Sequence, residues 1–113
     1  LDWAQRGVDR NPESPGAHVQ LSAALWEMAR AEPGMKQLDY YREGIEAFRK
    51  SLTLFPTEQG LTHQFAQSMM QVGQAFVDAG FVDEGERYKA ESRDARSRAA
   101  LLVRYKYDEL GLR

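Results

Sequence analysis

Proline placement sets the strongest limit on how this chain folds. All four prolines lie in the first half of the sequence, at positions 12, 15, 33 and 56. Proline lacks a backbone donor and clashes with the preceding helical turn, so it ends or interrupts helices. Residues 17–32 and 35–55 carry no such breaker, and no proline follows position 56. The sequence therefore predicts a few long helices.

Apolar residues recur at helical spacing within each of these segments. Spacings of three and four residues place side chains on one face of a helix. The predicted core stripes are Leu21, Ala24, Leu25 and Met28; then Tyr41, Ile45, Phe48, Leu52 and Phe55; then Leu61, Phe65, Met69, Val72 and Phe76. No stretch shows the sustained period of two that is typical of strands. We therefore expect an all-α chain.

Local signals give the ends of the first two helices. Pro33 disfavours helical backbone at the residue before it, so the first helix is expected to end there. The second helix is predicted over about residues 38–54, which leaves an inserted loop near residues 31–38. Pro56 closes the second helix.

Two further helices are predicted after Pro56. Thr57 and Glu58 are expected to cap and charge the first turn of the third helix, which ends where Ala79-Gly80 allows a left-handed turn. The fourth helix is expected over residues 82–110. Its mostly charged middle is either solvated or crosses a neighbouring helix closely through small residues. Those small residues are Ser92, Ala95 and Ala99.

The sequence also repeats itself. A shift of 44 residues places Pro12 on Pro56 and Leu25 on Met69. Each repeated unit consists of a helix end, a proline turn and an amphipathic helix. Units of this kind cannot bury an apolar face alone, so they stack on their neighbours.

These residues resemble the tetratricopeptide repeat, whose pattern is W-x2-L-G-x2-Y, then A-x3-F, then P. The segment Met69-x2-Val72-Gly73-x2-Phe76 resembles the first part of that pattern. Gly44-x3-Phe48, followed by Pro56, resembles the second part, with glycine in place of alanine. The resemblance implies an all-α fold of stacked antiparallel helix pairs, an α-solenoid, which here has a long C-terminal helix.

The resemblance further implies one domain over residues 1–113. In that domain residues 1–12 are the end of a preceding repeat helix, and residues 15–56 form the first helix pair. Residues 57–110 form the second pair, which contains the long terminal helix.

The same resemblance predicts a function in protein–protein interaction. In such stacks the first helix of each pair lines a groove, which is expected to bind a peptide or helix of a partner protein. Trp26 is the best single anchor, because tryptophan is enriched at binding hot spots, although packing in the core is its commoner role. The predicted partner-binding residues are Val19, Ala23, Trp26, Glu27, Arg30, His63, Gln67, Met70, Gln71 and Gln74.

Composition argues against several other functions. The formal net charge of −2 gives no basic excess for nucleic acid. With no cysteine and two histidines outside any metal-binding spacing, we expect no metal or cofactor. No phosphate loop or nucleophile motif is present, so we expect no enzymatic activity.

The last predicted helix suggests an alternative function. Residues 99–103 form the longest strictly apolar run, which is too short to insert into a membrane. Together with Tyr105, Tyr107 and Leu110, this run makes the helix apolar around most of its circumference. It either caps the last repeat or binds a second copy or the rest of a longer protein. The latter is a structural or oligomerising role, and the start at Leu1 leads us to expect such a longer protein.

Overall fold

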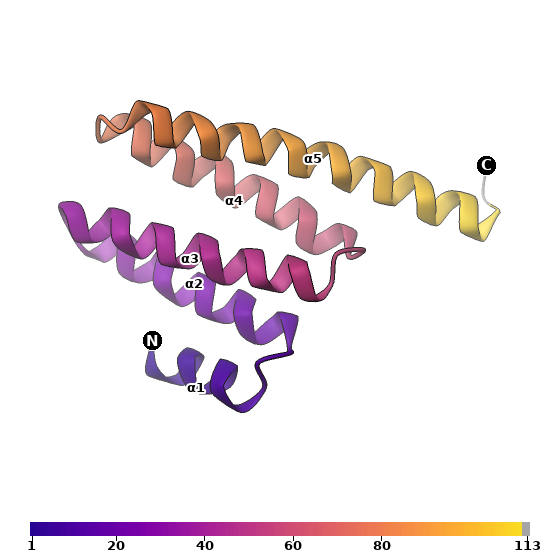
Figure 1. Ribbon diagram of the computed structural model, residues 1–113, viewed down its shortest axis with the longest axis horizontal. Coiled ribbons are helices and arrows are strands. Elements are labelled where there is room, and N and C mark those ends of the chain that lie inside the picture. The colour runs from indigo at the N-terminus through magenta and orange to yellow at the C-terminus, as the bar shows by residue number, and fades with distance from the viewer. Residues whose placement is uncertain (112–113) are drawn as a thin grey trace. The chain divides into compact units, whose positions relative to one another are not determined.

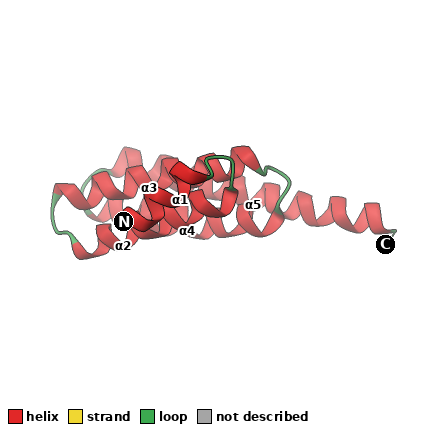
Figure 2. Cartoon of the chain, turned by 90° about the horizontal axis from the view of Figure 1, so that it is seen from below, coloured by secondary structure: helices red, strands yellow, loops and turns green. Residues whose placement is uncertain are grey.

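The computed structural model describes the backbone of residues 1–111 and the side chains of residues 1–104. Within this part of the chain there are five helices and no strand (Figures 1 and 2). The prediction of an all-α fold is therefore confirmed. The helices are α1 (Asp2–Arg10), α2 (Pro15–Ala31), α3 (Met35–Leu54), α4 (Gln59–Asp78) and α5 (Val82–Leu110).

The chain divides into two compact units, Leu1–Pro56 and Thr57–Arg113. In unit 1, helices α2 and α3 form an antiparallel pair, and α1 packs against α2 (Figure 1). In unit 2, helices α4 and α5 form the second antiparallel pair. No helix in the described part of the chain is both long and apolar enough to cross a membrane.

The connection between α2 and α3 is shorter than the loop predicted near residues 31–38. Only three residues, 32–34, lie between the two helices. Gly34 makes the turn with a φ of 81°, a conformation that glycine adopts without strain, and α3 begins at the next residue. The Gln37 side chain then donates a 2.9 Å hydrogen bond to the Ala29 carbonyl in the last turn of α2. Residues expected in the loop therefore extend α3.

The core of unit 1 is centred on a tryptophan that is inserted against α3. Trp26 is buried and stacks on Phe48, with 5.9 Å between ring centroids. Its indole N–H donates a 3.2 Å hydrogen bond to the Tyr41 carbonyl. A β-carbon at Gly44 would lie only 2.6 Å from Cδ1 of this ring, so a glycine is needed there.

Unit 2 is closed by a tight turn and a close helix contact. Gly80 has a φ of 94°, and its N–H and that of Phe81 donate to the Val77 and Phe76 carbonyls, as predicted for a left-handed turn. Gly73 and Gly85 then bring the two backbones together. A β-carbon on Gly85 would lie 2.5 Å from the Gly73 carbonyl oxygen.

The small residues of α5 continue this close contact. Ser92, Ala95 and Ala99 are all buried. The Ser92 hydroxyl donates a 2.6 Å hydrogen bond to the carbonyl of Ala66 on α4. The sequence left open whether the middle of α5 is solvated or crosses a neighbouring helix closely. The structure shows the close crossing, with α4 as the neighbour.

The structure corrects two details of the predicted helix ends. Glu58, rather than Thr57, is the cap of α4, and its carboxylate accepts a 3.1 Å hydrogen bond from the Gly60 N–H. Phe55 is 45% exposed instead of completing the core stripe of α3. The helix ends at Leu54, so Phe55 leaves the helical phase that would have placed it on the buried face.

Candidate functional site

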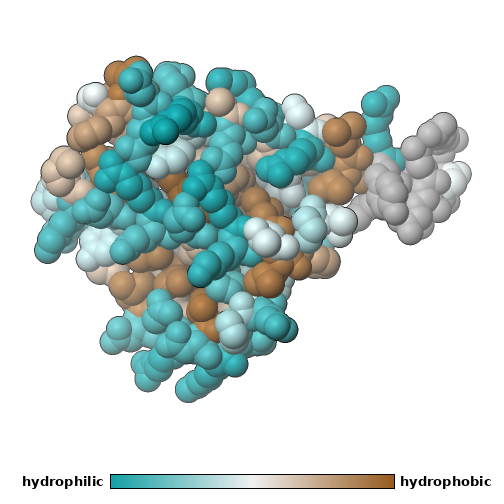
Figure 3. Space-filling model, in the orientation of Figure 1, coloured by the Kyte–Doolittle hydropathy of each residue, from teal (hydrophilic) through white to brown (hydrophobic). Residues whose placement is uncertain are grey.

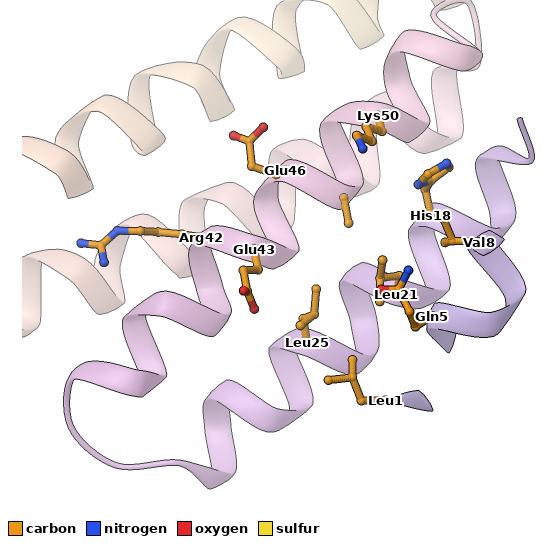
Figure 4. Close-up of a pocket in the computed structure, with 11 residues that line it drawn as sticks. Leu1, Gln5, Val8, His18, Leu21, Leu25, Arg42, Glu43, Glu46 and Lys50 are labelled. Atoms are coloured by element: carbon orange, nitrogen blue, oxygen red, sulfur yellow. The ribbon is translucent and has the colours of Figure 1, made fainter. Parts of the chain in front are cut away.

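A pocket of about 580 Å³ lies within unit 1, over α2 and between α1 and α3 (Figure 4). Its apolar lining consists of Leu1, Val8, Leu21, Leu25 and Ala47. Its polar lining consists of Gln5, His18, Arg42, Glu43, Glu46 and Lys50. The pocket therefore combines an apolar floor with charged side chains that come mainly from α3.

The helix arrangement of unit 1 explains why this space exists. Helix α1 packs against α2, and α2 packs against α3, whereas α1 and α3 make no direct helix contact. Ala47 is the one apolar residue of α3 in the lining, and its side chain is too short to fill the gap. Leu21 remains half-buried at the bottom of the pocket.

His18 fixes one end of the pocket. Its side chain is 4% exposed, and its Nε2 lies 2.7 Å from the Pro12 carbonyl oxygen. Because a carbonyl only accepts, Nε2 is the donor of this hydrogen bond. Nδ1 is buried and has no hydrogen-bond partner among the described residues. The histidine thus ties the turn before α2 to the helix.

The four charged residues of the lining differ in their partners. Arg42 forms a 3.0 Å ion pair with Asp39, and Glu46 forms one with Arg49, all of them on α3. Glu43 and Lys50 have neither a hydrogen bond nor an ion pair with any described side chain. In Figure 4, Glu43 points from α3 toward Leu25 of α2. Two opposite charges at the pocket are therefore unpaired among the side chains that the structure describes.

The predicted groove residues of α2 lie on another face of that helix. Ala23, Glu27 and Arg30 are exposed, and Val19 is half-buried. Trp26, the predicted anchor, is only 8% exposed and is occupied by the contacts with α3 described above. It is therefore a core residue and presents almost no surface to a partner.

The predicted groove residues of α4 also share one face of their own helix. Met70 is half-buried, and the others, His63, Gln67, Gln71 and Gln74, are exposed. Gln74 is engaged on both sides, since its amide donates to Asp78 and its oxygen accepts from Lys89 of α5. Because the α2 and α4 residues belong to different units, a groove that combines them stays a prediction.

Sequence reasoning missed the pocket because it treated the first twelve residues as the remnant of another repeat. The signal was nevertheless present on α3. Residues 43, 46, 47 and 50 follow the three-and-four spacing of one helix face, with a single alanine among charged residues. A single alanine among charged residues on one face of a helix predicts a shallow surface with a charged border.

Within the described residues, no group of three or more His, Asp or Glu side chains is arranged to hold a metal ion. Comparison of the chain with protein-family models, with curated proteins and with solved structures finds no match.

Proposed function

We propose that this chain is a protein-interaction module whose unit 1 pocket binds an apolar-faced peptide or helix of a partner protein. The observation that carries the proposal is the pocket itself, in which an apolar floor is bordered by charged side chains. Interaction surfaces commonly have this composition, with an apolar centre and a polar rim.

The extent of the charged border favours an elongated ligand. It runs along α3 from Arg42 to Lys50, which corresponds to about 12 Å at 1.5 Å per residue. An amphipathic helix that lays its apolar face into a groove presents side chains over such a length. The resemblance to tetratricopeptide repeats, which bind peptides, agrees with this proposal.

Two substitutions on α2 distinguish the pocket from the exposed face predicted by sequence. Leu21 lines the pocket, whereas Ala23 belongs to the exposed face. Peptides that bind the full chain are first selected from a display library in which no peptide sequence is fixed in advance. We expect Leu21→Gln to weaken binding of the selected peptides about tenfold, because it places an amide in the apolar floor.

Ala23→Gln is the matched control and is expected to leave that affinity unchanged. Circular dichroism of both variants checks that the helices are retained. If Ala23→Gln weakens binding and Leu21→Gln does not, the exposed face of α2 is the binding surface and the pocket is not. A selection that yields no peptide contradicts the proposed function.

A second candidate function is self-association through the end of α5. This helix has 29 residues against 20 in α4, and it extends past its partner (Figure 1). Leu101 is 60% exposed and Val103 is 37% exposed in this region. Figure 3 shows hydrophobic residues on the described part of α5 next to the grey atoms. Tyr105, Tyr107 and Leu110 lie outside the side chains that the structure describes.

Leu101→Lys tests this second function. If two copies associate through this segment, sedimentation of the wild-type chain shows a mass that rises with concentration. The substitution is then expected to raise the dissociation constant at least about tenfold, because it puts a charge into an apolar contact. Ala90→Lys, at an exposed position on α5, adds the same charge elsewhere and is expected to have little effect. A wild-type chain that stays monomeric at every concentration contradicts self-association.

A further inference from the structure

The unpaired charges at the pocket limit which helix it can accept. Arg42 and Glu46 are already neutralised by Asp39 and Arg49 on their own helix. Glu43 and Lys50 are unpaired among the described residues, and both line the pocket. A ligand that covers the pocket therefore meets one free carboxylate and one free ammonium group.

The positions of these two groups are fixed by α3. They are seven residues apart, so they lie on the same face of the helix, two turns or about 10 Å from each other. Because α2 and α3 are antiparallel, Glu43 lies at the Leu25 end of the pocket and Lys50 at the His18 end (Figure 4). The apolar floor lies between them.

We infer that the pocket selects a partner helix whose apolar face is bordered by a basic residue and an acidic residue two turns apart. The basic residue pairs with Glu43 and the acidic residue with Lys50, while apolar side chains between them enter the floor. This inference rests on the proposed function and specifies the partner of the same site.

The charge pattern argues against ligands that carry a single sign. A nucleic acid or an anionic lipid surface is attracted to Lys50 and repelled by Glu43 at the same pocket. A ligand with both signs at matching positions pairs with each group, and pairing at the rim of an apolar surface adds specificity more than affinity. Only the distance between the charges matters, since a helix can lie along α3 in either direction.

Synthetic helical peptides test the inference with the full chain. Each peptide has the same apolar face, with two variable positions seven residues apart that border it. The first peptide carries lysine and glutamate at these positions, the second two lysines, the third two glutamates and the fourth two glutamines. Affinities are measured by isothermal titration calorimetry at low salt, where surface charge pairs are least screened.

The wild-type chain is expected to bind the lysine–glutamate peptide about fivefold more tightly than either like-charged peptide, which is the scale of exposed ion pairs. Glu43→Lys is expected to shift the preference to the two-glutamate peptide. Lys50→Glu is expected to shift it to the two-lysine peptide. These shifts do not depend on the direction in which the peptide binds.

Lys36→Glu is the control, because Lys36 is exposed on α3 outside the pocket and the change in net charge is the same as for Lys50→Glu. It is expected to leave the order of the four peptides unchanged. Equal affinities for all four peptides, or the same order in every variant, would falsify the charge rule and leave the proposed function intact. Failure of all four peptides to bind also overturns the inference, whereas the display selection described above decides the proposed function separately.

Discussion

Replacing Gly85 with alanine is expected to destabilise unit 2 by about 2 kcal/mol, although alanine is the better helix former. The added β-carbon would lie 2.5 Å from the Gly73 carbonyl oxygen and 2.9 Å from the Val77 backbone nitrogen. Neither atom belongs to a side chain that can rotate away, so α4 and α5 must separate. The loss of packing then exceeds the gain of roughly 1 kcal/mol in helix propensity.

Thermal unfolding followed by circular dichroism measures this effect, which corresponds to a fall in Tm of about 10 °C. Hydrogen exchange shows whether the loss of protection is concentrated in α4 and α5. Gly7→Ala is the control, because no atom lies within 4 Å of a β-carbon at that position. It is expected to be neutral or to stabilise the chain by up to about 1 kcal/mol. A Gly85→Ala chain as stable as the Gly7→Ala chain contradicts the close contact.

Trp26→Ala is expected to destabilise unit 1 by about 3–5 kcal/mol, the range for removing a buried large aromatic side chain. The indole fills the notch at Gly44, stacks on Phe48 and donates a hydrogen bond to Tyr41. Its removal leaves a cavity between α2 and α3 that these helices cannot close without moving. A fall in Tm of at least about 12 °C follows from the lower limit.

The chain contains its own control for this experiment, since the other tryptophan, Trp3, is 60% exposed on α1. Trp3→Ala is expected to change stability by less than about 0.5 kcal/mol. Urea unfolding of both variants gives the free energies. Similar losses in the two variants would show that Trp26 does not form the core of unit 1. A binding defect of a Trp26 variant therefore has meaning only after its fold has been checked.

Much of the fold could be predicted because it follows from local rules. Apolar spacing identified the buried residues of α4, where Phe65, Met69 and Phe76 are all fully buried. Gly80 marked the turn because its backbone conformation suits glycine. The start of α3 was less predictable, because Gln37 satisfies a carbonyl of α2 through a contact that no sequence pattern records.

The candidate site was less predictable than the fold for a related reason. Helical periodicity tells which side of a helix is buried, but Trp26 lies at the border of the stripe and its burial depends on the space at Gly44 of another helix. The pocket likewise depends on where α1 rests on α2, and the sequence of α1 alone does not determine this. The burial of Trp26 and the pocket therefore both result from packing between different helices.

The packing of α1 on α2 has a consequence for how the pocket responds to a ligand. Helix α1 packs against α2, and it contributes Gln5 and Val8 to the wall of the pocket, with Leu1 just before its first residue. Any molecule that binds these three side chains in their helical arrangement stabilises α1, and by thermodynamic linkage each substitution that unwinds α1 lowers the affinity. Folding of the N-terminal helix and binding of a ligand in the pocket are thus coupled.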